Sequence, residues 1–198
     1  MRLSHGRLAV LALCALAPAG CGGERQDAGA PSGAFALAVT DASFPARQRI
    51  AEPATLRLEV ANTGERDVPE LAVTVETEPG TEGQAPASFA QRGDDPALAS
   101  AARPVWVLDA GPSGGESTYA NTWAVGPLGE GRTRTLEWRL TAVRPGSYTV
   151  AWRLAPALEG EVTLADGRTA GAFDVTIADD PVPARVDGDG DVIRGGAP

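Results

Sequence analysis

Large apolar residues alternate with polar or small residues along nine segments of the chain, and a period of two is the pattern of half-buried β-strands. Residues 56–61, for example, read Leu-Arg-Leu-Glu-Val-Ala. The clearest segments are 35–40, 56–61, 71–76, 136–140, 148–154 and 173–177, and three weaker ones are 105–108, 119–125 and 162–164. No segment shows a convincing helical period. The chain is therefore predicted to be an all-β protein.

Short turn sequences separate these segments, among them Asn62-Thr63-Gly64, Arg144-Pro145-Gly146 and Asp166-Gly167. About nine strands at close spacing predict an antiparallel β-sandwich over residues 35–179. Three of the tryptophans, Trp123, Trp138 and Trp152, fall on apolar positions or at a strand centre and are expected in the core with Leu58. A sugar-stacking platform is the alternative for these rings. Trp106 is ambiguous, because Val105 and Val107 compete with it for the inward face.

Two features of the strands resemble a known group of domains. Residues 54–64, Ala-Thr-Leu-Arg-Leu-Glu-Val-Ala-Asn-Thr-Gly, are an alternating strand that ends in Asn-x-Gly, and Val68-Pro69 leads into the next strand. Residues 131–153 combine a Leu-x-Trp-x-Leu strand, a Pro-Gly turn and a Ser-Tyr-Thr-Val strand. Both resemble bacterial CARDB-type domains, over roughly residues 35–178. The resemblance implies an immunoglobulin-like sandwich for cell-surface adhesion or protein contact, and it brings no catalytic residues.

The start of the chain has a different pattern. A short basic start leads into the apolar run 8–16, and the small residues Ala19 and Gly20 stand directly before Cys21. This layout predicts a secretory signal peptide over residues 1–20.

A cysteine at the cleavage point resembles the lipobox of bacterial lipoproteins, although Pro18 stands where that group usually has leucine. The resemblance implies that Cys21 carries a thioether-linked diacylglycerol. The alternative is an ordinary secretory signal followed by a chance cysteine. Residues 21–34 are interpreted as the acylated cysteine and a flexible tether. The protein is thus predicted to be extracytoplasmic and anchored to the cell membrane.

The composition after Cys21 excludes several classes of protein. The first 20 residues hold two of the 17 basic residues and no acidic one, so the rest has 15 basic and 26 acidic residues and a formal net charge of −11. That charge argues against nucleic acid as a partner. Residues 22–198 contain no His, Met, Lys or Cys. Zinc and copper sites, Ser–His–Asp or Cys–His catalysis and Schiff-base chemistry lack their usual residues. We expect no enzyme and no cofactor.

The segment 77–104 holds 28 residues without strand alternation, which is longer than most loops in compact domains. It is predicted to be either a binding loop or an insertion without a partner. As a binding loop it offers Phe89, Arg92, Asp94 and Asp95 as contacts. Arg92-Gly93-Asp94 also spells the tripeptide that integrins recognise, but three residues match by chance too readily to identify a partner.

The direction of the strands predicts where the loops lie. If every strand is antiparallel to the one before it, segment 77–104 opens at the end of the sandwich opposite Ala34. Gly126–Arg132 is then expected beside it, and Arg144–Gly146 at the same end as Ala34.

Asp187, Asp189 and Asp191 alternate with glycines, as carboxylates do in the first half of a calcium loop. Position twelve of such a loop needs a bidentate Glu or Asp, and here it is Pro198. A solvated, disordered acidic tail over residues 180–198 is therefore the preferred interpretation.

These observations predict a non-catalytic cell-envelope lipoprotein that displays its domain for contact with an envelope protein or a glycan. The alternatives are a weak calcium- or solute-binding envelope lipoprotein and an accessory subunit of an envelope complex. No pattern in the sequence indicates an oligomeric state.

Overall fold

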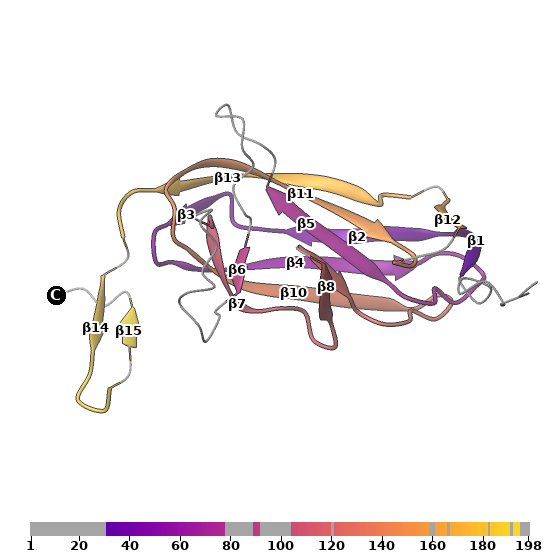
Figure 1. Ribbon diagram of the computed structural model, residues 1–198. Helices are drawn as coiled ribbons and strands as arrows, with labels where there is room; N and C mark the ends of the chain where they lie inside the picture. Colours follow the sequence, from indigo (N-terminus) through magenta and orange to yellow (C-terminus); the bar gives the residue numbers. More distant parts are fainter. Residues whose placement is uncertain are drawn as a thin grey trace, which may run out of the picture.

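The structure is a computed structural model that describes residues 31–77, 89–91, 104–119, 121–158, 161–165, 167–181, 183–190 and 192–194. Its regular elements are fifteen β-strands, so the predicted all-β class is confirmed. Eleven of them form the two sheets of a sandwich (Figure 1). In the part of the chain described, no helix is long and apolar enough to cross a membrane.

The first sheet has five strands in the order β2-β4-β10-β7-β6. They are β2 (Leu37–Ser43), β4 (Pro53–Asn62), β10 (Thr133–Ala142), β7 (Trp106–Ala110) and β6 (Phe89–Gln91). The second sheet has the order β3-β13-β11-β5-β9-β8. Its strands are β3 (Arg47–Arg49), β13 (Ala170–Ala178), β11 (Gly146–Ala155), β5 (Ala72–Thr77), β9 (Thr122–Ala124) and β8 (Glu116–Tyr119).

Four short strands pair outside the two sheets. β1 (Ser32–Phe35) lies parallel to β12 (Glu161–Leu164), and β14 (Ala184–Val186) is antiparallel to β15 (Val192–Arg194). Within the sheets most pairs are antiparallel, as predicted, but β6 with β7 and β3 with β13 are parallel.

The alternation of the sequence accounts for the core between the sheets. Along β4 the two leucines and Val60 are fully buried, while Arg57 and Glu59 lie on the outer face. Trp123, Trp138 and Trp152 are all buried, so the prediction that they belong to the core is confirmed. At the ambiguous position, Trp106 faces inward and is buried, and Val107 is half-buried. Val105 is buried as well, because β7 begins at Trp106 and Val105 therefore lies outside the alternation of the strand.

The segment 119–125 differs from its prediction as a single strand. It folds back on itself between β8 and β9, and Asn121 in this turn has a φ of 62°. Asparagine adopts this left-handed conformation more readily than most residues, because its short side chain can hydrogen-bond locally. The turn adds one reversal of chain direction that the sequence analysis did not include.

That reversal exchanges the positions of two loops. Near β1, Leu37 pairs with Asn62 and Ala61 pairs with Thr133, so 126–132 lies at this end and not opposite it. At the other end Ala142 pairs with Trp106 and Phe89 also pairs with Trp106, which places 144–146 there with β6. The predictions for these two loops were wrong. The distal position predicted for 77–104 holds for β6, the strand that the structure describes within it.

Both termini of the domain differ from the predicted boundaries. The tether was expected to run to residue 34, but Ser32 already pairs with Glu161 in β1. The acidic tail was expected to be disordered from residue 180, but β14 and β15 form a hairpin within it. These three strands have only three or four residues each. The alternation that identified the longer strands therefore has too few positions to be recognised in them.

Candidate interaction surfaces

Phe89, a predicted contact residue of segment 77–104, packs against the sandwich. Its ring lies 5.7 Å from that of Trp123 and 6.4 Å from that of Trp106, centroid to centroid. Because it is half-buried in this aromatic cluster, Phe89 anchors β6 to the body. Arg92, Asp94 and Asp95 lie outside the described residues, as does Cys21.

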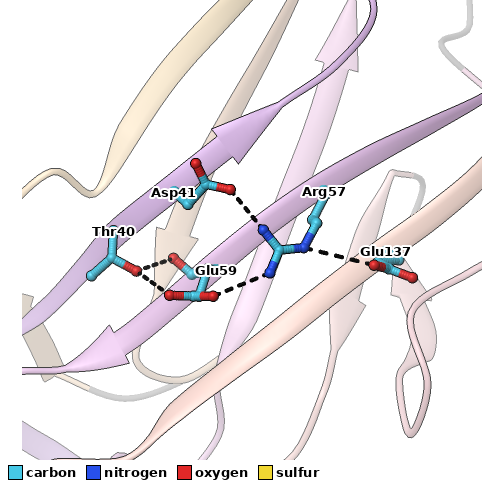
Figure 2. A network of polar contacts seen from close by, with 5 residues as sticks. All are labelled: Thr40, Asp41, Arg57, Glu59 and Glu137. Atoms are coloured by element: carbon cyan, nitrogen blue, oxygen red, sulfur yellow. Dashed lines mark hydrogen bonds and ion pairs between the residues drawn. The ribbon is translucent and has the colours of Figure 1, made fainter.

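A polar network lies on the outer face of the five-stranded sheet, across β2, β4 and β10 (Figure 2). The Arg57 guanidinium points into a group of three carboxylates. Its nitrogens lie 2.7 Å from Asp41 Oδ2, 3.1 Å from Glu59 Oε2 and 3.7 Å from Glu137 Oε1. The Thr40 hydroxyl donates to Glu59 Oε1 at 3.0 Å. One cation among three anions leaves this patch with an excess of negative charge.

The backbone explains how adjacent residues of β2 reach the same network. The register between β2 and β4 shifts between Val39 and Asp41, which is a β-bulge at Thr40. A bulge places two successive side chains on one face, so Thr40 and Asp41 both contact residues of β4. Across β4, Arg57 pairs directly with Glu137 in β10.

The outer face of the six-stranded sheet carries a shallow depression of about 390 Å³. Three alanines of β11 and β13, Ala151, Ala170 and Ala172, line it, and the ion pair between Arg153 and Glu76 forms one wall. Trp152 and Gly171 belong to its floor, since the alternation of β11 turns the indole into the core. This depression was not predicted from the sequence. In the sequence the depression corresponds only to small residues at outward strand positions, and these cannot be distinguished from exposed alanines elsewhere in the chain.

Gly171 is required where β13 crosses that indole. A Cβ on residue 171 would lie 2.5 Å from Trp152 Cζ2, which is closer than two carbon atoms can approach. The absence of a side chain therefore lets the large Trp152 ring fill the edge of the core.

At the end of the sandwich where the chain enters, Arg66 contacts the first strand. Its guanidinium lies 4.8 Å from the centre of the Phe35 ring, and Nη2 donates to Ser32 O at 3.4 Å. A cation over an aromatic ring is stabilising by about 0.5–1 kcal/mol at exposed sites. These contacts hold β1 at this end of the domain.

Asp187 and Asp189, two of the three residues considered for calcium, lie in the loop that joins β14 to β15. Asp187 Oδ1 accepts a hydrogen bond from the Asp189 N–H at 3.0 Å, which is the side-chain turn that aspartate commonly makes. Asp191 lies outside the described residues. Among the residues described, no group of three or more His, Cys, Asp or Glu side chains is arranged to hold a metal ion.

Tyr148 secures the turn between β10 and β11. Its hydroxyl donates to Pro145 O at 2.9 Å, and its ring meets Trp106 edge-on at 5.8 Å. Burial raises the pKa of this hydroxyl above its ordinary value of 10.0, although Arg144 opposes the effect.

We expect Tyr148→Phe to lower the free energy of unfolding by about 1 kcal/mol at neutral pH, because one hydrogen bond is lost. The raised pKa favours the protonated hydroxyl in the folded state, so its contribution is complete below pH 10.0 and is lost as the pH rises further. Urea unfolding at several pH values should therefore show the difference between variant and wild type shrinking above that pH. A difference that stays constant would contradict this assignment.

No protein-family model and no curated protein matches the chain. Among solved structures, it is similar to the CARDB domain of a protein from Pyrococcus furiosus, crystallised in complex with di-metal ions. The identity is 18% over 73% of this chain and 89% of that chain, with a TM-score of 0.45. It is also similar to a small part of alpha-2-macroglobulin from Escherichia coli, at 14% identity over 75% of this chain and 7% of that chain, with a TM-score of 0.41. A part of beta-glucosidase from Listeria innocua gives 16% identity over 75% of this chain and 16% of that chain, and a TM-score of 0.41. At these identities the likeness concerns the fold alone.

Proposed function

We propose that this protein is a non-catalytic lipoprotein of the cell envelope that displays its sandwich for contact with an envelope protein or a glycan. The observation that carries the proposal is the placement of its two ends. The chain enters the domain through β1 at one end, and β6, a strand within the long segment 77–104, lies at the other. An anchor at Cys21 would therefore hold β1 toward the membrane and present β6 away from it.

The contacts at the β1 end support a fixed orientation of this kind. Arg66 holds Ser32 and Phe35, and four residues of β1 pair with β12. Only residues 21–31 then separate the predicted lipid from the folded domain. Eleven residues span at most about 40 Å when fully extended, so the domain stays close to the membrane surface.

The anchor is tested by Cys21→Ser. We expect the variant to leave the membrane fraction and to be recovered as soluble protein, because two acyl chains are sufficient for stable attachment and none remains. The matched control is Cys14→Ser, which changes the other cysteine, in the predicted signal peptide, and should leave fractionation unchanged. Membrane attachment that persists in Cys21→Ser would refute acylation at this position.

The contact itself is tested separately, with purified protein and isolated envelope material divided into protein and glycan fractions. A variant with Arg92, Asp94 and Asp95 all changed to Ala should lose binding. A control with Glu65→Ala and Glu130→Ala alters exposed charges at the β1 end and should bind normally. If the triple variant binds as well as the control, the contact does not involve these residues of segment 77–104.

A further inference from the structure

The hairpin β14–β15 stands apart from the sandwich. It projects beyond the end of the two sheets, and its main pairing is between its own strands (Figure 1). Val186 is 65% exposed and Ile193 is 36% exposed, and these are two of the three large apolar residues that are exposed in the described part of the chain. A two-stranded hairpin is marginally stable in water and gains stability from a third strand or a packed face.

The connection to the hairpin directs it away from its own domain. Arg49 of β3 holds Asp180, with Nη2 2.6 Å from Asp180 Oδ2 and Nε donating to Asp180 O at 3.0 Å. Pro181 and Pro183 follow, and proline restricts the backbone on both sides of itself. To reach β13 of the same chain, the hairpin would have to pass β3 and release Asp180.

β13 has an open edge over most of its length. One side pairs with β11 from Ala170 to Ile177, but the other side pairs with β3 only from Thr176 to Ala178. Thr176 N–H donates toward β3, to Ala46 O at 2.9 Å, so the even-numbered residues of β13 direct their backbone groups to this side. Ala172 and Asp174 therefore present their N–H and C=O groups between two points where the chain of β2 and β3 bonds to this side, the Val39 N–H to Arg168 O at 2.8 Å and the Thr176 N–H to Ala46 O. No strand pairs with Ala172 and Asp174 on this side in the described part of the chain.

This edge lacks the usual protection against strand addition. Proteins commonly block exposed edges with lysine, proline or a bulge. Residues 170–174 read Ala-Gly-Ala-Phe-Asp, and their ladder with β11 runs without a shift of register. The depression lined by Ala170 and Ala172 adjoins the edge and leaves room for side chains of an added strand.

We propose that β14 of one copy adds to the edge of β13 in a second copy, so that the protein associates head to tail. Charge favours this pairing, because Arg185 is exposed on β14 and Asp174 is exposed on β13. The two surfaces differ and lie on different parts of the molecule. A dimer therefore still has one free hairpin, on one copy, and one free edge, on the other, and association can continue to longer assemblies. This inference does not depend on the lipid anchor.

The test is sedimentation of the purified full chain over a range of concentrations. We expect the wild type to form dimers and larger species as concentration rises. Ala172→Pro removes an edge N–H that the ladder with β11 does not use, and Val186→Asp places a charge on the hairpin. Each should raise the dissociation constant at least about tenfold. Val143→Asp is the matched control, because Val143 is 41% exposed but belongs to neither surface, and it should associate like the wild type.

An equal mixture of the two defective variants decides the geometry. Ala172→Pro retains its hairpin and Val186→Asp retains its edge, so the mixture should form dimers that do not grow. A wild type that stays monomeric at all concentrations, or a mixture that stays monomeric, would overturn the proposal. Should Ala172→Pro fail to fold, as judged by its melting temperature, Asp174→Arg replaces it. Its weakened association should then be restored by Arg185→Glu in the same chain.

Discussion

Trp138→Ala is expected to lower the free energy of unfolding by roughly 3–5 kcal/mol, since a large aromatic side chain is removed from a core that can close only partly around the cavity. Trp138 is 0% exposed at the middle of β10, and its ring meets Trp123 edge-on at 5.5 Å. Urea unfolding followed by far-UV circular dichroism measures the change without relying on the fluorescence of the residue that is replaced. A midpoint close to that of the wild type would contradict the assigned core.

Phenylalanine variants separate the packing of a tryptophan from its hydrogen bond. Trp138 Nε1 is buried and has no acceptor in the part of the chain that the structure describes. Trp138→Phe therefore removes volume and an unsatisfied donor but no hydrogen bond.

Trp106→Phe is the matched comparison, because Trp106 is equally buried but its Nε1–H donates to Gln48 Oε1 at 2.8 Å. This change leaves a buried acceptor unpaired, which costs about 1–3 kcal/mol in addition to the lost packing. We expect Trp106→Phe to be the more destabilising of the two. The reverse order would show that the Gln48 contact does not stabilise the fold.

The core could be predicted from the sequence because burial and strand geometry share one period. Leu56, Leu58 and Val60 must lie on one face of any regular strand, and only the inner face of each sheet in a sandwich is buried. The chain direction could not be predicted in the same way. It depended on Asn121, where one residue at positive φ divides a segment that alternates well enough to be taken as a single strand.

The interaction surfaces were less predictable than the core because they depend on neighbours that are distant in the sequence. Phe89 stood in a segment without alternation, and only its contacts with Trp106 and Trp123 show that it anchors a strand. Arg57 and Glu137 are 80 residues apart and become a pair only once β4 and β10 are placed in register. Cys21 remains a prediction from a local pattern, which needs no tertiary contact to be recognised.

Asn62→Ala is expected to lower the free energy of unfolding by roughly 2–4 kcal/mol, because three side-chain hydrogen bonds of about 1 kcal/mol each are lost at a buried site. Asn62 Nδ2 donates to Arg66 O at 2.8 Å and to Leu128 O at 3.0 Å, and its Oδ1 accepts from the Gly64 N–H at 3.1 Å. The asparagine of the Asn-x-Gly motif thus ties together the loops after β4 and before β10. Thermal unfolding of Asn62→Ala should show a lower melting temperature, whereas Thr63→Ala, at the exposed neighbouring position, should melt like the wild type.

Asn62→Asp tests the direction of these bonds. The aspartate keeps an acceptor for the Gly64 N–H, but as a carboxylate it faces the Arg66 and Leu128 carbonyl oxygens with no proton to donate. Burial beside these oxygens should raise the pKa of the new carboxyl above its unfolded value, so its penalty appears as the pH rises above about 4. Measured against wild type at each pH, Asn62→Asp should therefore be less destabilising at pH 4 than at pH 7, in contrast to Asn62→Ala, whose deficit should not change. A pH-independent deficit for both variants would mean that Nδ2 does not donate to these carbonyls and that the motif acts only through the shape of its turn.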